Sequence, residues 1–323
     1  MDKTLFMLKI AKYLYHNTWI GKKIIDSVFD VHHYYRSHYI DDATFLKQNF
    51  KKRFGRSLDL NHPKTLNEKI NWLKLHDRTA LHTTCADKFE VRKYVEEAIG
   101  AKYLIPLVFQ SYHPEDVISS NFPEYPFIMK ANHDSSGGTI VRDKAVVDWK
   151  KMQKHFKKLL RKNYYYSGKE WQYKNIKPCV IVEKLLVNEA GEIPFDYKIH
   201  CFHGKVEVIQ VDIDRYTNHK RNLYDADWNL LPYTWSLWKD GKPLWDNGRD
   251  LKKPKNLNEM LNVATKLSQP FCYARIDVYD FEGTVYFGEV TFHHGSGLET
   301  IYPEKYDLAL GELLDITKIK KEA

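Results

Sequence analysis

The sequence is poor in cysteine and lacks long apolar runs. Its 323 residues include only four cysteines, Cys85, Cys179, Cys201 and Cys272. No two of them have the spacing of a metal site, and each lies in an apolar or strand-like stretch, which predicts buried free thiols and a reducing compartment. No apolar run is long enough to cross a bilayer, and no small-residue cleavage site follows the N-terminal stretch, which Lys9 and Lys12 interrupt. We therefore expect a cytoplasmic protein.

Signatures of nucleic-acid binding are also absent. The formal net charge is +8, and lysines gather at residues 150–162, 252–255 and 318–321. No helix-turn-helix, zinc-finger or RNP-like motif accompanies this charge, so we expect no nucleic-acid partner. The basic runs fit either solvated helix faces or attraction to an anionic surface. The basic, amphipathic N-terminal pattern likewise fits packing on the core or on a partner, or peripheral binding at the inner membrane surface.

Hydrophobic periodicity predicts an α+β protein. Residues 1–50 have helical spacing, and residues 61–65 have the pattern of a turn and helix cap. Further helices are expected at 66–76, 87–100, 146–162 and 256–267. Short strands are expected at 103–109, 125–129 and 179–182, with hairpins at 197–212 and 273–291. Since many of these strands run antiparallel, we expect mixed or antiparallel sheets.

The last hairpin carries the clearest chemical pattern. Its turn opens with Asp280 and has a glycine at the position that favours a left-handed backbone. This pattern favours a three-residue loop with a bulge. In that register Asp280 opposes Thr284, and Arg275 opposes Glu289.

One face of this hairpin is expected to be polar. Arg275, Asp277, Glu289 and Thr291 share it. The opposite face is apolar, with Ile276, Val278 and Val290. Two carboxylates on one face are the oxygen ligands that Mg²⁺ needs when it also holds substrate phosphates, and Arg275 can stabilise developing negative charge. A two-residue loop would put the carboxylates on opposite faces, and a surface hairpin with a salt bridge is the alternative interpretation.

A strand that ends near Lys130 leads into a Gly/Ser loop. The loop residues are Asp134, Ser135, Ser136, Gly137 and Gly138. Such a loop can present backbone N–H groups to phosphate oxygens, and Lys130 adds a point charge. It is not a Walker A loop, because no Gly-Lys-Ser/Thr follows. A glycine-rich hairpin turn is the alternative.

Two further segments fit a nucleotide site. Glu183, Lys184 and Leu186 end a strand, whose edge and apolar neighbours can hold an adenine or form an ordinary strand end. Lys88 lies at a predicted helix start, where a cation is unfavourable unless it meets an anion.

In order and spacing these pieces resemble the ATP-grasp superfamily, most closely its TupA-like branch from capsule and teichuronopeptide biosynthesis loci. The resemblance covers residues 64–307. The matching pieces are TLNEKINW at 65–72, ADK at 86–88, Met129-Lys130 with its loop, EKLL at 183–186, FDYKIHCFHG at 195–204, ARID at 274–277 and FGEVT at 287–291. The resemblance implies an ATP-grasp fold with a helical N-terminal extension at 1–80. It implies an N-terminal half with a phosphate-loop lid at 81–190, and a C-terminal half with the metal hairpin and an aromatic insertion at 191–323.

The resemblance also implies roles for single residues. Lys88 and Lys130 neutralise ATP phosphates, and the loop 134–138 closes over them. Glu183, Lys184 and Leu186 frame the adenine, with Glu189 or Glu192 near the ribose. Lys198 approaches the γ-phosphate, Arg275 stabilises the transferring phosphoryl group, and Asp277, Glu289 and Thr291 bind magnesium. Thr291 departs from the pattern, because the family often has Asn there, and helices replace the usual N-terminal substrate domain.

The implied function is an ATP- and Mg²⁺-dependent carboxylate–amine ligase that acts through an acyl-phosphate. Basic and aromatic surface favours a uronic acid of a capsular or cell-surface polysaccharide as the carboxylate, with an amino acid or amino alcohol as the amine. A glycan kinase on the same nucleotide site and a non-catalytic glycan-assembly protein are the alternatives.

Two other groups of residues fit more than one role. His293 and His294 precede Gly295-Ser296-Gly297 and favour a substrate loop over a zinc site, since adjacent strand residues point to opposite sides. The aromatic insertion fits either a glycan surface or internal packing. Its aromatic residues are Trp228, Tyr233, Trp235, Trp238 and Trp245.

Overall fold

The computed structural model describes residues 18–19, 23–24, 34–135, 138–214 and 217–319. Most of the helical pattern predicted over residues 1–33 lies outside these ranges, as do Ser136 and Gly137 of the predicted phosphate loop. The α-helices are α3 (Asp42–Phe54), α4 (Leu66–His76), α5 (Ala80–Ala86), α6 (Val91–Ile99), α7 (Trp149–Leu159), α8 (Tyr165–Gly168), α9 (Leu257–Ser268) and α10 (Lys305–Leu313). The strands are β1 (Leu107–Ser111), β2 (Phe127–Ala131), β3 (Thr139–Val141), β4 (Val180–Lys184), β5 (Asp196–Phe202), β6 (Lys205–Ile213), β7 (Lys220–Tyr224), β8 (Thr234–Ser236), β9 (Trp238–Lys239), β10 (Lys242–Pro243), β11 (Tyr273–Phe281), β12 (Thr284–Thr291) and β13 (Thr300–Tyr302).

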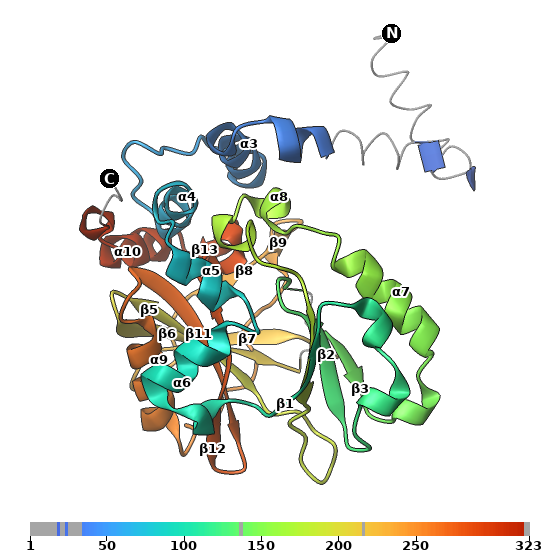
Figure 1. Cartoon of the computed structure of the whole chain (residues 1–323). Helices are drawn as coiled ribbons and strands as arrows, with labels where there is room; N and C mark the ends of the chain where they lie inside the picture. The colour runs from blue at the N-terminus through green and yellow to red at the C-terminus, as the bar shows by residue number, and fades with distance from the viewer. Residues whose placement is uncertain (1–17, 20–22, 25–33, 136–137, 215–216, 320–323) are drawn as a thin grey trace.

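Two sheets form the framework, and Figure 1 shows them side by side. One has the strand order β1-β4-β2-β3 and the other the order β12-β11-β5-β6-β7. Within the described ranges, every pairing between named strands of these sheets is antiparallel. A single parallel bridge joins Leu104 to Phe287. The expected α+β class is therefore confirmed.

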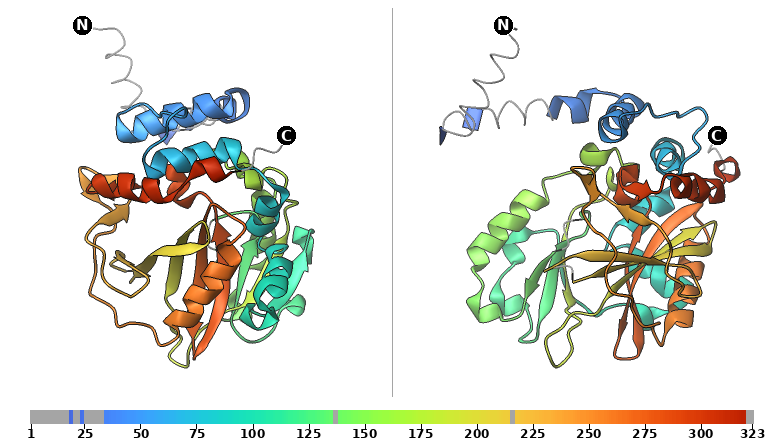
Figure 2. Two further views of the ribbon diagram at one scale, coloured as in Figure 1. Left: turned by 90° about the vertical axis from the view of Figure 1, so that its left-hand side faces the viewer. Right: turned by 180° about the vertical axis from the view of Figure 1, so that it is seen from behind.

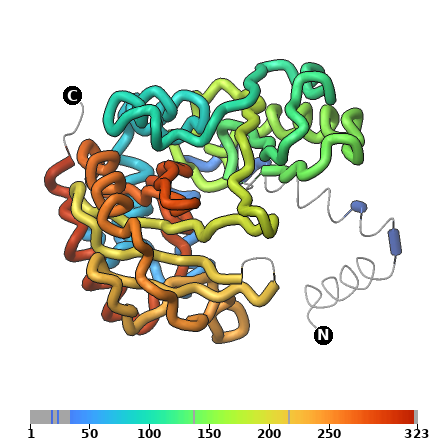
Figure 3. The backbone as a smooth tube through the Cα atoms, turned by 90° about the horizontal axis from the view of Figure 1, so that it is seen from below, coloured from blue at the N-terminus to red at the C-terminus, as the bar shows by residue number. Residues whose placement is uncertain are grey.

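Helices cover each sheet on one side. α9 and α6 pack against the five-stranded sheet, and α7 packs against the four-stranded one. α4 and α10 run together across one end of the molecule (Figure 2). Seen from below in Figure 3, the chain from β1 to β4 and the chain from β5 to β12 occupy separate halves. The surfaces that face each other between these halves come from strands rather than from the covering helices.

Alternation along β11 decides which face of its sheet is polar. Ile276 and Val278 are fully buried and belong to the core that includes α9, together with Val290 of β12. Burial of each such side chain stabilises the fold by about 1.5–3 kcal/mol. The neighbouring Arg275 and Asp277 therefore project from the opposite face. The apolar face that the sequence predicts is confirmed.

The predicted helix at 66–76 is confirmed, and its start has a clear cause. The Thr65 hydroxyl accepts a hydrogen bond from the Glu68 N–H at 3.3 Å, and the Glu68 carboxylate accepts one from the Thr65 N–H at 3.1 Å. This reciprocal capping box satisfies two N–H groups that a helix start leaves unpaired.

The helix predicted over 87–100 is shorter than expected. It begins at Val91, because the Asp87 carboxylate accepts hydrogen bonds from the N–H groups of Phe89 and Glu90 and turns the chain first. Its end at Gly100, where φ is 103°, agrees with the prediction.

The sequence predicts that no segment crosses a membrane and that the four cysteines are buried free thiols. No described helix combines the length and apolar character needed to span a membrane. Cys85, Cys179 and Cys201 are buried free thiols, as predicted, whereas Cys272 is partly exposed.

Candidate active site

The hairpin of β11 and β12 has a different turn from the one expected. Phe281 lies opposite Thr284, so only Glu282 and Gly283 form the turn. Both have positive φ, 50° and 79°, as a tight primed turn requires. The predicted three-residue loop, with Asp280 opposite Thr284, is therefore wrong.

A bulge further along the hairpin restores the shared polar face. Val278 lies opposite Phe287 and Asp277 lies opposite Glu289, so Gly288 is an extra residue on β12. If Gly288 paired regularly with Asp277 instead of bulging, Glu289 would lie opposite Ile276 and the two carboxylates would be on opposite faces. Added to Gly288, a Cβ atom would lie 3.1 Å from the carbonyl oxygen of Asp277, which explains a residue without a side chain there.

Arg275 binds both carboxylates. Its Nε and Nη2 donate to Asp277 Oδ1 and Oδ2 at 2.7 and 2.8 Å, and Nη2 also donates to Glu289 Oε1 at 2.9 Å. Thr291 lies opposite Arg275, where Glu289 was expected, and its hydroxyl donates to Glu289 Oε1 at 3.3 Å. All four predicted polar residues of the hairpin are in contact.

Three lysines surround this cluster. Lys198 of β5 lies opposite Asp277, with Nζ 3.3 Å from Asp277 Oδ2, and it also binds Asp196. The Nζ of Lys88 lies 3.6 Å from Glu289 Oε2 and donates to the carbonyl of Asp134 in the loop after β2. Lys88 therefore connects the four-stranded half of the molecule to the metal hairpin predicted in the other half.

Lys130 and Glu183 form a pair within the four-stranded sheet. The Nζ of Lys130 lies 2.8 Å from Glu183 Oε2, and Arg92 Nη1 lies 2.9 Å from Glu183 Oε1. Lys184 is exposed and Leu186 is buried at the end of β4, and the exposed Glu189 lies in the loop that follows. The carboxylate of Glu183 is therefore committed to two cations, which leaves its backbone and Leu186 as the parts suited to an adenine edge.

The charges in this cluster shift each other's ionisation. Burial raises the pKa of Glu289, but the positive charges of Lys88, Arg275, Lys198 and Lys130 outweigh burial and lower it to about 2. Burial lowers the pKa of Lys198, and Asp277 opposes that shift. The ion pair of Lys88 with Glu289 shows that the two halves face one another at the cluster.

The donor set fits magnesium as a partner of substrate phosphates. The described residues contain no group of three His, Cys, Asp or Glu side chains arranged to hold a metal. They do place two opposed carboxylates and one hydroxyl together. Magnesium is commonly held by one or two carboxylates, with water and substrate phosphates completing its shell.

Sequence reasoning missed a clamp between α4 and η6 (His294–Gly297). Asn67, Asn71 and Lys74 lie on one face of α4, and their side chains donate to the carbonyls of Glu299, Gly297 and Ser296 at 3.0, 3.0 and 2.9 Å. The sequence does contain a signal that could have predicted this clamp. Three polar side chains recur at positions i, i+4 and i+7, on the face of the helix that is buried.

This clamp holds a strained loop. Ser296 has φ 57°, a left-handed conformation that costs about 1–2 kcal/mol for a residue with a side chain. Lys74 is 1% exposed, and its Nζ also donates to Ser296 Oγ at 2.7 Å. The loop directly follows the predicted metal strand, so α4 shapes the surface next to the carboxylate pair.

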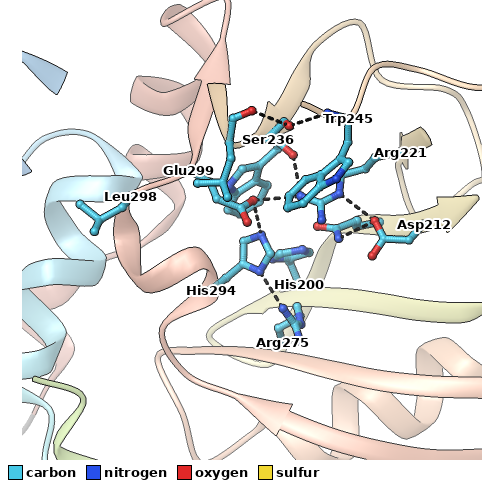
Figure 4. A network of polar contacts seen from close by, with 12 residues as sticks. His200, Asp212, Arg221, Ser236, Trp245, Arg275, His294, Leu298 and Glu299 are labelled. Carbon is cyan, nitrogen blue, oxygen red and sulfur yellow. Dashed lines mark hydrogen bonds and ion pairs between the residues drawn. The ribbon is translucent and has the colours of Figure 1, made fainter. Parts of the chain in front are cut away.

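The same loop carries His294, which connects the cluster to a second buried network. His294 Nδ1 lies 2.7 Å from Arg275 Nη1, and its Nε2 lies 3.2 Å from Glu299 Oε2 (Figure 4). Glu299 also binds Arg221, which binds Asp212. The expected position of His294 near the active centre agrees with these contacts.

The aromatic insertion is largely packed. Tyr233 and Trp235 are 6% and 1% exposed and belong to a core with α4 and α10. Trp245 is partly exposed, with the Arg221 guanidinium 4.3 Å from its ring centre. Packing therefore accounts for most of the insertion, and Trp245 is the member placed beside the polar network.

Three comparisons with known proteins were informative to different degrees. No curated protein matches the chain. The D-alanine–D-alanine ligase from Bacillus anthracis is a structural neighbour with 18% identity and TM-score 0.42, covering 72% of this chain and 66% of that chain. The Helicobacter pylori enzyme of the same name has 15% identity and TM-score 0.39, covering 78% and 70%. The ATP-grasp ligase PsnB, complexed with a minimal precursor, has 9% identity and TM-score 0.36, covering 66% and 54%.

A family profile gives the assignment. The profile of the TupA-like ATP-grasp family matches residues 68–315, which include most of helix α4, the lysines Lys88, Lys130 and Lys198, and the whole β11–β12 hairpin. The chain therefore belongs to the TupA-like ATP-grasp family.

Proposed function

We propose that this protein is an ADP-forming carboxylate–amine ligase that uses ATP and Mg²⁺. The observation that carries the proposal is the opposed pair Asp277 and Glu289, bound by Arg275 and surrounded by lysines from both halves. A buried cluster with this many charges is costly unless each charge is paired. Its composition suits a ligand that brings both phosphate anions and a metal cation.

Binding of the nucleotide would exchange partners within the cluster. Lys88, Lys130 and Lys198 now pair with carboxylates, and phosphate oxygens would take over these cations. Asp277 and Glu289, with Thr291, would then hold Mg²⁺, which neutralises charge on the phosphoryl oxygens. Each lysine and each carboxylate of the cluster would therefore have a partner of opposite charge both before and after the nucleotide binds. Entry of the nucleotide would leave no buried charge unpaired, which avoids a large desolvation cost.

The proposed reaction has two steps. A substrate carboxylate oxygen attacks the γ-phosphorus of ATP, the bond to the β,γ-bridging oxygen breaks, and an acyl-phosphate and ADP form. An amine then attacks the acyl carbon, and inorganic phosphate leaves as the amine loses a proton. Arg275 and Lys198 would stabilise the transferring group, and closure of the loop 134–138 would exclude water from the acyl-phosphate.

The nucleotide would lie between the halves that Figure 1 shows side by side. We assign residues 81–190 to the half that holds adenine and phosphates, through Lys130, Glu183, Lys184, Leu186 and Glu189. Residues 191–323 would form the half that holds the metal and the acceptor, with residues 1–80 as a helical extension. The strand ends and the contact from Lys88 to Glu289 support this division.

We assign the carboxylate to a uronic acid of a capsular or cell-surface glycan and the amine to an amino acid or amino alcohol. The partly exposed Trp245 supplies an aromatic face of the kind that stacks on a sugar ring. The N-terminal region would attach the protein to the inner membrane surface. In support, Trp19 and Ile24 are 74% and 59% exposed, and Lys23 lies over Trp19.

The test is ADP formation over paired uronic acids and amines, with product mass measured in parallel. We expect ADP release that needs both substrates and a product of amide mass. The control is the variant Asp277→Asn, which should release no ADP above background. A stable phosphorylated product without amine would instead identify a glycan kinase, and failure to bind ATP with Mg²⁺ in calorimetry would reject the proposal.

A further inference from the structure

Arg275 has one N–H group to spare. A guanidinium carries five N–H donors in a fixed planar fork. Nε and both hydrogens of Nη2 bind Asp277 and Glu289, and one hydrogen of Nη1 binds His294. In the described part of the chain, no acceptor is recorded for the second Nη1 hydrogen. The direction of that hydrogen follows from the plane of the other four bonds.

His294 is the contact that does not come from the metal hairpin. Its Nδ1 faces an N–H of Arg275, so it must accept, and the ring proton must lie on Nε2. Nε2 lies 3.2 Å from Glu299 Oε2. The two atoms lie at ion-pair distance without an aligned hydrogen bond, and the nearby carboxylate favours the ring proton on Nε2, which faces it.

The partners of Glu299 are themselves held. Arg221 Nη1 lies 2.9 Å from Glu299 Oε2 and also donates to the Trp235 carbonyl at 2.8 Å. Arg221 Nε lies 2.8 Å from Asp212 Oδ1. Figure 4 shows this relay running from Arg275 through His294 and Glu299 to Arg221 and Asp212.

The relay is buried, so the electrostatic contacts between its charged and polar groups are stronger than they would be in water. Arg221, His294 and Glu299 are 6%, 3% and 7% exposed. Burial raises the pKa of Glu299, but His294 and Arg221 lower it to about 2, so Glu299 is a carboxylate. Burial lowers the pKa of His294, an effect that Glu299 opposes, which agrees with a neutral ring.

The loop that carries His294 is built to admit Glu299. Gly295 has φ 54°, and a Cβ atom there would lie 2.5 Å from Glu299 Cγ. A side chain at position 295 would therefore displace Glu299 from His294. The glycine serves the relay as well as the left-handed turn.

From this geometry we propose that His294 is a positioning residue for Arg275, held by Glu299 and Arg221 so that the spare N–H of Arg275 points at the transferring phosphoryl group. The proposal rests on the proposed function for its last clause only. The tautomer and the relay are properties of the free protein. The relay that orients Arg275 ends at Asp212 on β6 and Arg221 on β7. In the order of the sheet, β5 separates these strands from the metal hairpin.

Two substitutions separate the two contacts of the ring. In His294→Asn the amide oxygen replaces Nδ1 and keeps an acceptor for Arg275, whereas in His294→Gln the amide replaces Nε2 and keeps the contact to Glu299. We expect His294→Gln to lower kcat about 10- to 100-fold with the KM for ATP changed less than about threefold. His294→Asn should retain most of kcat. His155→Gln, on the exposed side of α7, is the control and should match the wild type.

The tautomer is measured directly by nitrogen-15 NMR of labelled histidines in the free full-length protein at pH 7. We expect Nδ1 of His294 to be unprotonated and Nε2 protonated, with the signal assigned by its loss in His294→Asn. A protonated Nδ1 would overturn the relay whether or not the protein is a ligase. Equal kcat for His294→Gln and the wild type would overturn the positioning role. If the wild type forms no ADP with any substrate pair, the proposed function fails while the NMR result still decides the relay.

Discussion

Asp277 and Glu289 lie directly opposite each other on β11 and β12, although only two residues join these strands. The bulge at Gly288 produces this arrangement, because it adds one residue to β12 between the turn and Glu289. Bulges are typical of sites where a side chain must be redirected. In this hairpin the redirected side chain is half of the carboxylate pair.

The bulge gives the first prediction. Insertion of one glycine after Gly288, with the bulge otherwise unchanged, should move Glu289 opposite Ile276 on the apolar face and lower ADP formation at least about 100-fold, since a metal ligand is lost. Gly288→Ala keeps the residue count, and its Cβ would meet the Asp277 carbonyl at 3.1 Å, a contact that small shifts relieve. It should retain most of the activity. Activity assays after circular dichroism has confirmed folding measure the difference, and an active insertion variant would refute the assignment.

The carboxylates give the second prediction. Asp277→Asn and Glu289→Gln keep the shape of each side chain and remove its charge, so Lys198, Lys88 and Arg275 lose their anionic partners. We expect kcat to fall at least about 100-fold in each variant. Magnesium titrations of the ATP complex by calorimetry should show weaker metal binding. Unchanged magnesium dependence in both variants would exclude these residues as ligands.

The lysine that joins the two halves gives the third prediction. Lys88→Met removes the contacts to Glu289 and to the Asp134 carbonyl. A bond to a charged group is worth about 1.5–3 kcal/mol, so the Kd for ATP should rise about 10- to 100-fold. The exposed Lys157 on α7 is the matched control, and Lys157→Met should bind ATP as the wild type does. Equal affinities for the two variants would contradict the role of Lys88.

Lys74 gives a prediction about pH and stability. Burial, opposed in part by Glu170, lowers its pKa in the folded protein from 10.5 to about 8. Between these values the unfolded chain binds more protons at this site than the folded chain, so the Lys74 contribution to the free energy of unfolding rises with pH. At about 1.4 kcal/mol per pKa unit, the rise amounts to about 3 kcal/mol between pH 8 and 10.5.

The variant Lys74→Met isolates this effect. Urea unfolding of wild type and variant at pH 8, 9 and 10 should show a stability difference that grows with pH in favour of the wild type. Other groups titrate alike in both proteins and cancel. The exposed Lys93, which pairs with Glu97 on α6, provides the control Lys93→Met. A difference that is constant with pH would show that Lys74 keeps its proton throughout this range.

The parts of the fold that depend on residues close together in the sequence were predictable. The capped helix α4 was predicted to the residue, because Thr65 and Glu68 satisfy each other within one turn. The polar and apolar faces of β11 followed from alternation, and the contacts among Arg275, Asp277, Glu289 and Thr291 agree with the pattern that predicted them.

The register of the hairpin was not predictable for a physical reason. A glycine after Glu282 is compatible with both a three-residue loop and a two-residue turn. The bulge that compensates for the shorter turn depends on packing across the sheet rather than on the turn residues. The prediction therefore reached the shared face through the wrong register.

The relay from Arg275 to Asp212 could not be predicted from the sequence for another reason. Arg221 and Glu299 are 78 residues apart and meet only because β7 and the loop before β13 converge. No local pattern encodes such a meeting. Single-sequence reasoning therefore located the charged residues of the cluster and missed those that hold them in place.

The clamp from α4 also joins the N-terminal and C-terminal parts of the chain. Asn67 donates hydrogen bonds to the Asp307 carboxylate and to the Glu299 carbonyl. A helix from the N-terminal part of the chain therefore holds two segments near its C-terminal end. A chain released without its last helix would therefore have α4 but would lack the Asp307 carboxylate that binds it, and the loop after β12 would lose part of its support.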